Sequence, residues 1–489
     1  MRSPVGSPRL SGFLRIQRLL AIAQTSTFLS ADAFRLAILQ AKEGTDTNLY
    51  QDIVETFKKL LPDDPLTQLD TEWVQKQNIR IKSETNRLEY ELKAYKNNLI
   101  KESIRVSEKR KEFLHKGDIL LIRYTVQMGN EDLANHFFAI GDLPSAFKAY
   151  SRMRDYCTTP RHIAELTMKQ LHVSVAQSNW VVAQSYYLKV HALLLKDEEK
   201  AKYDPILHAC LGLANLQQGF YREAANSFLN VAPSYMNPEA VAGINFQREV
   251  ISPNDIAVYG GLTALATMDR TELQRRVLDN SSFRQFLELE SHLRRAISMF
   301  CAAKYTGCMA ILESYHTDYM LDLFLQDHFM KLYWMVRGKS IVQWFSAFSV
   351  VTLDALAKAF PTPPEYAGTI EQELGVMIRA GRLKARINLV DRLLISPDQD
   401  ARFAVMENSL RMAKQTETSL RLKLHKVNMT ATGFDVKSPK NQGQNGFDAF
   451  TAAGGGEGAS GATGQALRNL KGKLTKGSSL GGGITAYMT

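Results

Sequence analysis

Basic and apolar side chains alternate in the stretch IRAGRLKARINLVDRLLI, which runs from Ile378 to Ile395. Because successive side chains of a strand point to opposite faces, the stretch predicts one basic face and one apolar face. The basic face would carry Arg382, Lys384 and Arg386, and the apolar face Leu383, Ala385 and Ile387. Cationic side chains in a row bind phosphate or carboxylate groups. The stretch is therefore either the wing of a DNA-binding module or the edge of a sheet that docks protein.

Motifs of enzyme chemistry are absent from the sequence. It has no His-Glu-x-x-His or His-x-His metalloprotease signature, no phosphate-binding Gly-x-x-x-x-Gly-Lys-Ser/Thr loop and no Gly-x-Ser-x-Gly elbow. One Gly-x-Gly-x-x-Gly string, at 456–461, follows no strand and is interpreted as chance. The four cysteines form no Cys-x-x-Cys pair, which favours free thiols in a reducing compartment. The sequence therefore predicts no catalytic site, no metal site and no cofactor.

Two helical segments precede the basic hairpin and would position it. The first is predicted over Val351–Phe360 and ends at the string PTPP. The second is predicted over Glu365–Ala380 and ends at Gly381. Its apolar side would consist of Ile370, Leu374, Met377 and Ile378. Helix, helix and two-stranded hairpin, over residues 346–398, is the order of a winged helix.

Acidic residues on the second helix oppose the DNA-binding interpretation. In a DNA reader, the N-terminal half of this helix would enter the major groove. That half carries Glu365, Glu371 and Glu373, and no Lys or Arg before Arg379. Carboxylates near phosphates oppose binding, because affinity for DNA rests mainly on cationic contacts. The sequence favours a protein-docking sheet edge, where Lys and Arg discourage indiscriminate strand pairing. A winged-helix regulator that binds nucleic acid is the alternative.

A spaced pattern of glycine, alanine and aromatic residues lies upstream, within residues 128–253. Its three units are Gly141, Ala146 and Tyr150; Ser178, Ala183 and Tyr187; and Gly219, Ala224 and Phe228. In an array of helical hairpins, the glycine ends one helix and the alanine lets the next cross closely. The ring then fills the space between neighbouring hairpins. The pattern predicts such an array, which would bind proteins along a concave face, and a plain helical bundle is the alternative.

Helical periodicity extends over most of the remaining chain. It predicts an N-terminal helical region over 1–105, with one long helix from Thr71 to about Arg105, further helices over 254–345, and a C-terminal helix over 399–428. The apolar stripe of this last helix consists of Phe403, Met406, Leu410, Ala413 and Leu420. Residues 441–489 hold thirteen of the 30 glycines. The tail, 429–489, is predicted to be disordered because it has too few apolar residues to offset its ordering entropy.

Charge and hydropathy constrain the partners. The formal net charge is +10, which permits acidic partners without identifying them. No apolar run approaches the ~20 residues of a membrane helix, so no membrane association is predicted. Basic residues interrupt the apolar stretch of MRSPVGSPRLSGFLRIQRLLAIA, which favours an amphipathic helix over a signal peptide.

Several strings between Ser11 and about Ile395 resemble a known family. They are SGFLRIQRL, NNLIKESIR, AIGDLPSAFKAYSRMRDYC, SPNDIAVYGGLTALATMDRTELQRRVLDNSSFRQFLELE and the winged-helix segment. With the order array, winged helix, long helix and tail, they resemble the PCI-domain subunits of large complexes, and among these the subunit 1 family of the COP9 signalosome. The string from Ser252 to Glu290 is the most specific. The equivalent PCI subunit of the proteasome lid is the alternative, similar in the winged helix but much less so in AVYGGLTALATMDR and RMRDYC.

The resemblance implies a fold and a role. The fold would be mainly α: a right-handed TPR-like array, a PCI winged helix with a small antiparallel sheet, a C-terminal helix and a disordered tail. The role would be a non-catalytic scaffold of the signalosome, which removes the modifier Nedd8 from cullins. Its partners would be other PCI subunits, the metalloprotease subunit and, indirectly, cullin-RING ligases, in nucleus and cytoplasm. Nucleic acid is not an expected partner.

The resemblance also assigns contact surfaces. Arg382–Ile387 and Arg392–Ile395, including Arg392 and Leu394, would form the edge between subunits. Ala401–Val427, with the stripe Phe403 to Leu420, would enter a common bundle of helices.

Residues 106–127, VSEKRKEFLHKGDILLIRYTVQ, depart from the family pattern, in which KESIR is expected to continue into a segment like MGNEDLANHF. The segment is basic, and Lys116, Gly117 and Asp118 are expected to break the helix. Its ends, Val-Ser and Gln, can be encoded by donor-like and acceptor-like splice sequences, and its length keeps the reading frame. The hypothesis is a retained intron, and a genuine loop specific to this lineage is the alternative.

Overall fold

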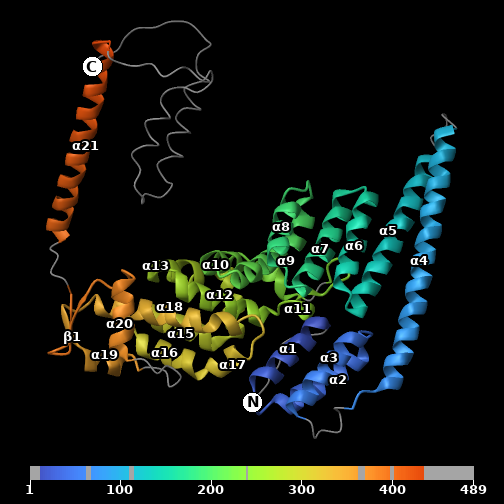
Figure 1. The fold of residues 1–489 in the computed structure, drawn as a ribbon, viewed down its shortest axis with the longest axis horizontal. Helices are drawn as coiled ribbons and strands as arrows, with labels where there is room; N and C mark the ends of the chain where they lie inside the picture. The colour runs from blue at the N-terminus through green and yellow to red at the C-terminus, as the bar shows by residue number, and fades with distance from the viewer. Residues whose placement is uncertain are drawn as a thin grey trace. The chain divides into compact units, whose positions relative to one another are not determined.

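The computed structural model describes residues 12–61, 68–108, 115–237, 240–361, 369–396 and 401–433, and only the backbone of 102–108, 115–120, 122, 401 and 404. The chain divides into two compact units, residues 1–397 and 398–489. The first unit is helical with one three-stranded sheet, and the second contains α21 (Ala401–Ala431) (Figure 1). The predicted mainly helical fold with a small antiparallel sheet and a separate C-terminal helix is confirmed. The predicted disordered tail began at residue 429, but residues 429–431 belong to α21. From residue 434 on, the tail lies outside the described residues.

Apart from an isolated β-bridge between Val241 and Ile244 and short 3₁₀ turns, the described residues of the N-terminal half of the first unit are organised as α-helices. They are α1 (Phe13–Thr25), α2 (Ser30–Glu43), α3 (Thr47–Leu60), α4 (Thr71–Glu108), α5 (His115–Ile140), α6 (Leu143–Met153), α7 (Pro160–Ala176), α8 (Trp180–His191), α9 (Asp197–Gln217), α10 (Tyr221–Leu229) and α11 (Phe246–Glu249). Helices α5 to α9 stand side by side in chain order, as expected for stacked hairpins (Figure 1).

The following helices surround α12 (Pro253–Thr267) and α18 (Gln326–Phe345). They are α13 (Arg270–Leu273), α14 (Ser281–Leu289), α15 (Ser291–Cys301), α16 (Tyr305–Ser314) and α17 (His316–Met320). The winged helix then comprises β1 (Val350–Thr352), α19 (Leu353–Ala359), α20 (Ile370–Arg379), β2 (Arg386–Asn388) and β3 (Leu393–Ile395).

The predicted repeat units coincide with three turns between helices. Gly141, Ser178 and Gly219 all have left-handed backbones, with φ of 86°, 56° and 81°. At Gly219 the amide donates to the carbonyl of Leu216, and the next amide donates to the carbonyl of Asn215, at 3.0 and 2.9 Å. The other two turns repeat this pair of bonds. Each turn is therefore a Schellman motif, and Ser178 adopts a conformation in which glycine is strongly preferred.

The alanine and the ring of each unit fill the space between helices, with one correction. Ala146, Ala183 and Ala224 are all at most 3% exposed. In the first and third units, the rings of Tyr150 and Phe228 are buried as predicted. In the middle unit the prediction was one residue off, because the buried ring is Tyr186 rather than Tyr187. The ring of Tyr187 packs instead on His191 and His208 at the surface of the hairpin.

The sequence pattern missed a fourth unit, between α15 and α16. Ala303 has a φ of 59°, and the same two backbone bonds form there. Cys308 and Leu312, five and nine residues later, are 0% and 1% exposed, in the positions of the alanine and the ring. The hairpin geometry of the array therefore recurs in the region around α18.

The long hairpin of α4 and α5 corrects another expectation. Helix α4 begins at Thr71 as predicted and continues three residues beyond Arg105. Helix α5 begins at His115, so Lys116, Gly117 and Asp118, where a break was predicted, lie in its first turn. A glycine inside a helix costs only about 1 kcal/mol, and the α4–α5 contact through Leu92, Val126 and Leu133 stabilises the pair. Residues 109–114 lie outside the described part.

An ion pair fastens α1 to the helices around α12. Arg18 Nη2 lies 2.7 Å from Asp255 Oδ2, and the carboxylate of Asp255 also accepts a bond from the backbone of Ser252 at the start of α12. The guanidinium of Arg18 also lies over the ring of Phe324. The predicted amphipathic character of this N-terminal stretch agrees with α1, whose Leu14 and Ile16 are buried. None of the helices formed by described residues is both long and apolar enough to cross a bilayer.

Candidate assembly surfaces

The sheet of the winged helix has the strand order β1-β3-β2, with both pairings antiparallel. Leu394 in β3 faces Val351 of β1 on one side and Ile387 of β2 on the other, and it is 0% exposed. The expectation that Arg392–Ile395 forms a sheet edge is therefore wrong, since β3 is the central strand. The sequence missed β1, because Val351 and Thr352 were assigned to a helix that in fact begins at Leu353.

The segment before β2 has the predicted two faces. Leu383 and Ala385 are 3% and 9% exposed, while Arg382, Lys384 and Arg386 are exposed. Strand β2 itself is shorter than predicted and begins at Arg386. Of these candidates, the three cations face solvent and can meet a partner. Leu383 and Ala385 support the winged helix from inside.

The two outer strands expose different chemistry. On the β1 side, Phe348 and Val350 are 44% and 48% exposed, whereas the β2 side presents the cations just described. At the tip of the hairpin, Leu389 and Val390 are 68% and 91% exposed. These four apolar residues were not among the predicted site residues. An apolar pair inside a turn, where polar residues are usual, was the available signal.

Arg392 follows the tip and has a left-handed backbone with a φ of 51°. Its guanidinium lies 3.3 Å from Glu371 Oε1 on α20 and 3.6 Å from Asp354 Oδ1 on α19. All three side chains are partly open to water, so these pairs contribute little stability. Arg392 therefore links β3 to both helices of the winged helix and is engaged within the chain.

Helix α20 offers little to nucleic acid. Among described residues it begins at Ile370, and the predicted earlier start at Glu365 lies outside them. Ile370, Leu374 and Met377 are buried as predicted, and Gly381 ends the helix with a φ of 68°. Glu373 is also buried, against Arg337 of α18. The exposed face carries one cation, Arg379, and its apolar neighbour Val376.

Helix α21, in the second unit, exposes its predicted apolar stripe. Phe403, Met406, Leu410 and Leu420 are 66%, 60%, 53% and 58% exposed, and Ala413 is exposed as well. A soluble helix normally buries such a stripe against another element. The stripe is therefore a candidate surface for partner helices.

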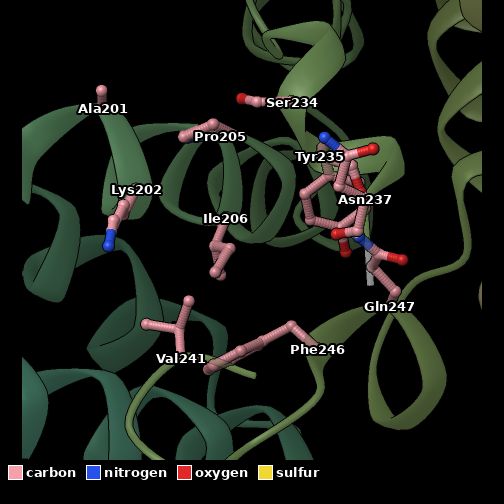
Figure 2. A pocket seen from close by; sticks show the side chains of 10 residues that line it. All are labelled: Ala201, Lys202, Pro205, Ile206, Ser234, Tyr235, Asn237, Val241, Phe246 and Gln247. Atoms are coloured by element: carbon pink, nitrogen blue, oxygen red, sulfur yellow. Dashed lines mark hydrogen bonds between the residues drawn. The ribbon is translucent and has the colours of Figure 1, made fainter. Parts of the chain in front are cut away.

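The described residues hold no group of three or more His, Cys, Asp or Glu side chains placed to bind a metal ion. Figure 2 shows a small cavity of about 100 Å³ between α9 and α11. Its residues are Ala201, Lys202, Pro205, Ile206, Ser234, Tyr235, Asn237, Val241, Phe246 and Gln247. The side-chain amide of Gln247 donates to the carbonyls of Tyr235 and Asn237. Lys202 is the one charged side chain among these residues, so the cavity brings no acid and base together.

Comparisons with known proteins agree with this architecture. A family model described as PCI domain matches residues 312–398, and one described as 26S proteasome subunit RPN7 matches residues 120–276. The chain is 43% identical to COP9 signalosome complex subunit 1 of Emericella nidulans over 435 residues, covering 87% of this chain and 81% of that protein. It is 33% identical to the Arabidopsis thaliana protein of the same name, covering 88% of this chain and 90% of that protein. A 26S proteasome non-ATPase regulatory subunit 6 from Oryza sativa is 25% identical over 40% of this chain.

Proposed function

Because the chain belongs to the COP9 signalosome complex subunit 1 family, we propose that it is a non-catalytic scaffold subunit of a COP9 signalosome. In this role it assembles with other PCI-domain subunits and with the metalloprotease subunit that removes Nedd8 from cullin-RING ligases. It would act in nucleus and cytoplasm.

The observation that carries the proposal is the exposed stripe of α21. Burying one large apolar side chain contributes roughly 1.5–3 kcal/mol, so residues such as Phe403 and Leu410 would stabilise a bundle of several helices substantially. Most of the stability of helices in proteins comes from packing an apolar face against a partner, rather than from helix propensity. The stripe therefore fits a helix that other subunits cover.

The sheet edges support the same role. Strands β1 and β2 leave outer backbone groups available for strand pairing, and they differ in chemistry. The uncharged edge near Val350 and the cationic edge near Arg386 cannot both suit one neighbour. Different edges are expected to select different PCI subunits, with the basic edge meeting an acidic surface.

Two alternatives are less well supported. Similarity to the proteasome subunit covers 40% of the chain, against 87% for the signalosome relative from Emericella nidulans. A nucleic-acid-binding winged helix is opposed by the single cation, Arg379, on the exposed face of α20 and by the apolar hairpin tip at Leu389 and Val390.

Affinity purification of the tagged chain, with mass spectrometry of the proteins that co-purify, tests the proposal. The full chain is compared with a version that ends at Ser396 and with the substitutions Leu410→Glu and Leu420→Glu. Recovery of PCI subunits and a His-x-His metalloprotease, lost in both altered versions, is expected. Recovery of proteasomal ATPases instead would assign the chain to the lid. Recovery of nuclease-sensitive chromatin proteins alone would support the DNA-binding alternative.

A further inference from the structure

Helix α4 has a second apolar face, which points away from α5. Its residues occur at alternating steps of four and three: Ile79, Ser83, Asn86, Tyr90, Lys93, Asn97 and Ile100. All seven are exposed, and the three large apolar ones, Ile79, Tyr90 and Ile100, are 70%, 76% and 55% exposed. The opposite face holds Val74 and Leu92, which are buried. We call these seven residues the outer stripe of α4.

The spacing of the outer stripe suits a helix as its partner. Steps of four and three keep residues on one face of an α-helix over many turns, as in the seams where two helices pack. From Ile79 to Ile100 the stripe covers about six turns. Its large apolar side chains are separated by about three turns. Between them lie Ser83, Asn86 and Asn97, which let another helix approach, and Lys93, which offers it a positive charge.

Cations border the stripe. Residues 76–101 contain seven Lys or Arg and three Glu. By helix geometry, Arg80 and Lys101 lie on one border of the stripe and Lys82 on the other, while Lys93 belongs to the stripe. These four are exposed, and none forms an ion pair with another described residue. Of the three glutamates only Glu89 is exposed at the border, on the side of Lys82. The positive charge is therefore strongest on the side of Arg80 and Lys101, and Lys93 keeps the other side weakly positive.

From this geometry we propose that the outer stripe of α4 docks an acidic amphipathic helix of a partner protein. The partner would place apolar residues on Ile79, Tyr90 and Ile100, and Asp or Glu residues on both flanks. A second copy of this chain does not fit, because in an antiparallel pair Arg80 would lie beside Lys101 of the other copy. Parallel pairing would place each cation beside itself. This inference goes beyond the proposed scaffold role, since α4 lies outside the PCI domain match at 312–398.

The test uses the full chain and a defined probe. The probe is a fluorescein-labelled helical peptide of about four heptads with Leu at the a and d positions and Glu at e and g. A comparison peptide has Lys in place of each Glu. Binding is followed by fluorescence anisotropy at two salt concentrations. Stronger binding of the Glu peptide, by about tenfold or more, and weakening by salt are expected.

Variants locate the binding surface. Tyr90→Glu is expected to weaken binding of the Glu peptide by about tenfold or more, because central aromatic residues dominate such contacts. Leu188→Glu is the matched control, since Leu188 on α8 is also an exposed apolar residue, at 69%. It should bind the peptide like the original chain.

Four outcomes would overturn the proposal. Equal binding of the Glu and Lys peptides would mean that charge does not select the partner, and unchanged binding by Tyr90→Glu would place the peptide elsewhere. Tighter binding of duplex DNA than of the Glu peptide, insensitive to Tyr90→Glu, would identify a nucleic-acid surface. Self-association that Tyr90→Glu abolishes, seen by sedimentation, would make a second copy the occupant. Co-purification of signalosome subunits would be unaffected by any of these results, so the scaffold proposal is tested separately.

Discussion

Arg337 on α18 and Glu373 on α20 form a buried ion pair that joins the helical part of the PCI region to the winged helix. Arg337 Nε lies 3.0 Å from one carboxylate oxygen of Glu373 and 3.2 Å from the other, and the two side chains are 0% and 9% exposed. The terminal nitrogens of the guanidinium donate to the carbonyls of Phe360 and Pro361, at 2.9 and 2.7 Å. The guanidinium thus binds α20 and the end of α19 at once.

Breaking this pair from one side is expected to destabilise the chain. Glu373→Leu would leave a buried guanidinium without its carboxylate, which costs about 3–5 kcal/mol. The double substitution Arg337→Met with Glu373→Leu removes both charges and should cost much less. Urea unfolding followed by circular dichroism measures the free energy of unfolding of the single and the double variant. Equal losses in the single and double variants would show that the ion pair is not what holds the winged helix in place.

Two glycines provide a matched test of packing. A Cβ at Gly261 in α12 would overlap the side chain of Leu293, whereas a Cβ at Gly375 in α20 would meet nothing within 4 Å. Gly261→Ala is therefore expected to lower the free energy of unfolding by about 1–3 kcal/mol. Gly375→Ala should raise it by up to about 1 kcal/mol, because alanine favours the helix. Thermal unfolding of the two variants checks whether the free energy of unfolding changes in opposite directions. A lower stability in both variants would contradict the difference in packing between the two sites.

Local signals made most of the helices predictable. Two of the three predicted turns of the array are marked by glycine, whose left-handed backbone lets one helix end and the next begin within two residues. The middle turn has Ser178 but keeps the alanine and an aromatic residue. The fourth hairpin has Ala303, Cys308 and Leu312 at the three positions, so none of the residue types of the pattern was there to reveal it. Gly117, where a break was expected, lies instead in the first turn of α5, and a single glycine costs a helix only about 1 kcal/mol.

The candidate surfaces were predictable only in part. The alternation of buried and exposed side chains around Leu383 and Arg386 follows from local strand geometry, and the structure shows it. The place of Leu394 in the sheet depends on β1, which is more than 40 residues away in the chain and whose pairing no local pattern reveals. Burial of Glu373 likewise depends on Arg337, 36 residues earlier. Non-local contacts of this kind decide which predicted residues remain open to a partner.

His172 on α7 is expected to make the fold sensitive to acid. Burial lowers the pKa of His172 to about 4, so the imidazole is neutral at pH 7, and its Nε2 lies 3.3 Å from a carboxylate oxygen of Glu249 on α11. Its pKa in the unfolded chain is near 6.5. Between these values the unfolded chain binds the additional proton, so stability is lost as pH falls from about 6.5 to 4, by about 3 kcal/mol.

The variant His172→Phe isolates this effect. The rings of Phe138 and Phe246 lie beside His172, so phenylalanine suits the site and does not titrate. Burial raises the pKa of Glu249, so this carboxyl group adds stability as the pH falls, opposite in sign to the contribution of His172. The contribution of Glu249 remains in His172→Phe. The pH dependence of urea unfolding should be flatter for His172→Phe than for the original chain. His425→Gln, at an exposed histidine on α21, should leave the pH dependence of unfolding unchanged. If the pH dependence of His172→Phe matched that of the original chain, His172 would not be the source of the acid sensitivity.

Residues 106–127 remain a question for the transcript. If they are a retained intron, most messages will lack codons 106–127, and the mature chain will join Arg105 to Met128. Against this, Val126 and Gln127 are buried, and the RPN7 family match begins at residue 120. We predict that sequencing the complementary DNA across this region yields mostly spliced reads. Reads that keep all of these codons would establish a genuine extension of the α4–α5 hairpin.

Because the two edges of the sheet differ in chemistry, we expect a substitution at each edge to remove a different neighbouring subunit from the complex. Val350→Lys introduces a charge into the uncharged edge of β1, and Arg386→Glu reverses a charge on the edge of β2. Each should reduce co-purification of one PCI subunit and spare the other, because each edge meets its own partner. Both positions are exposed, so stability should change by no more than about 0.5 kcal/mol. Lys358→Glu, on the exposed face of α19, is the control and should keep both neighbours. If both edge variants lost the same subunit, or neither lost any, assembly through two distinct edges would be wrong.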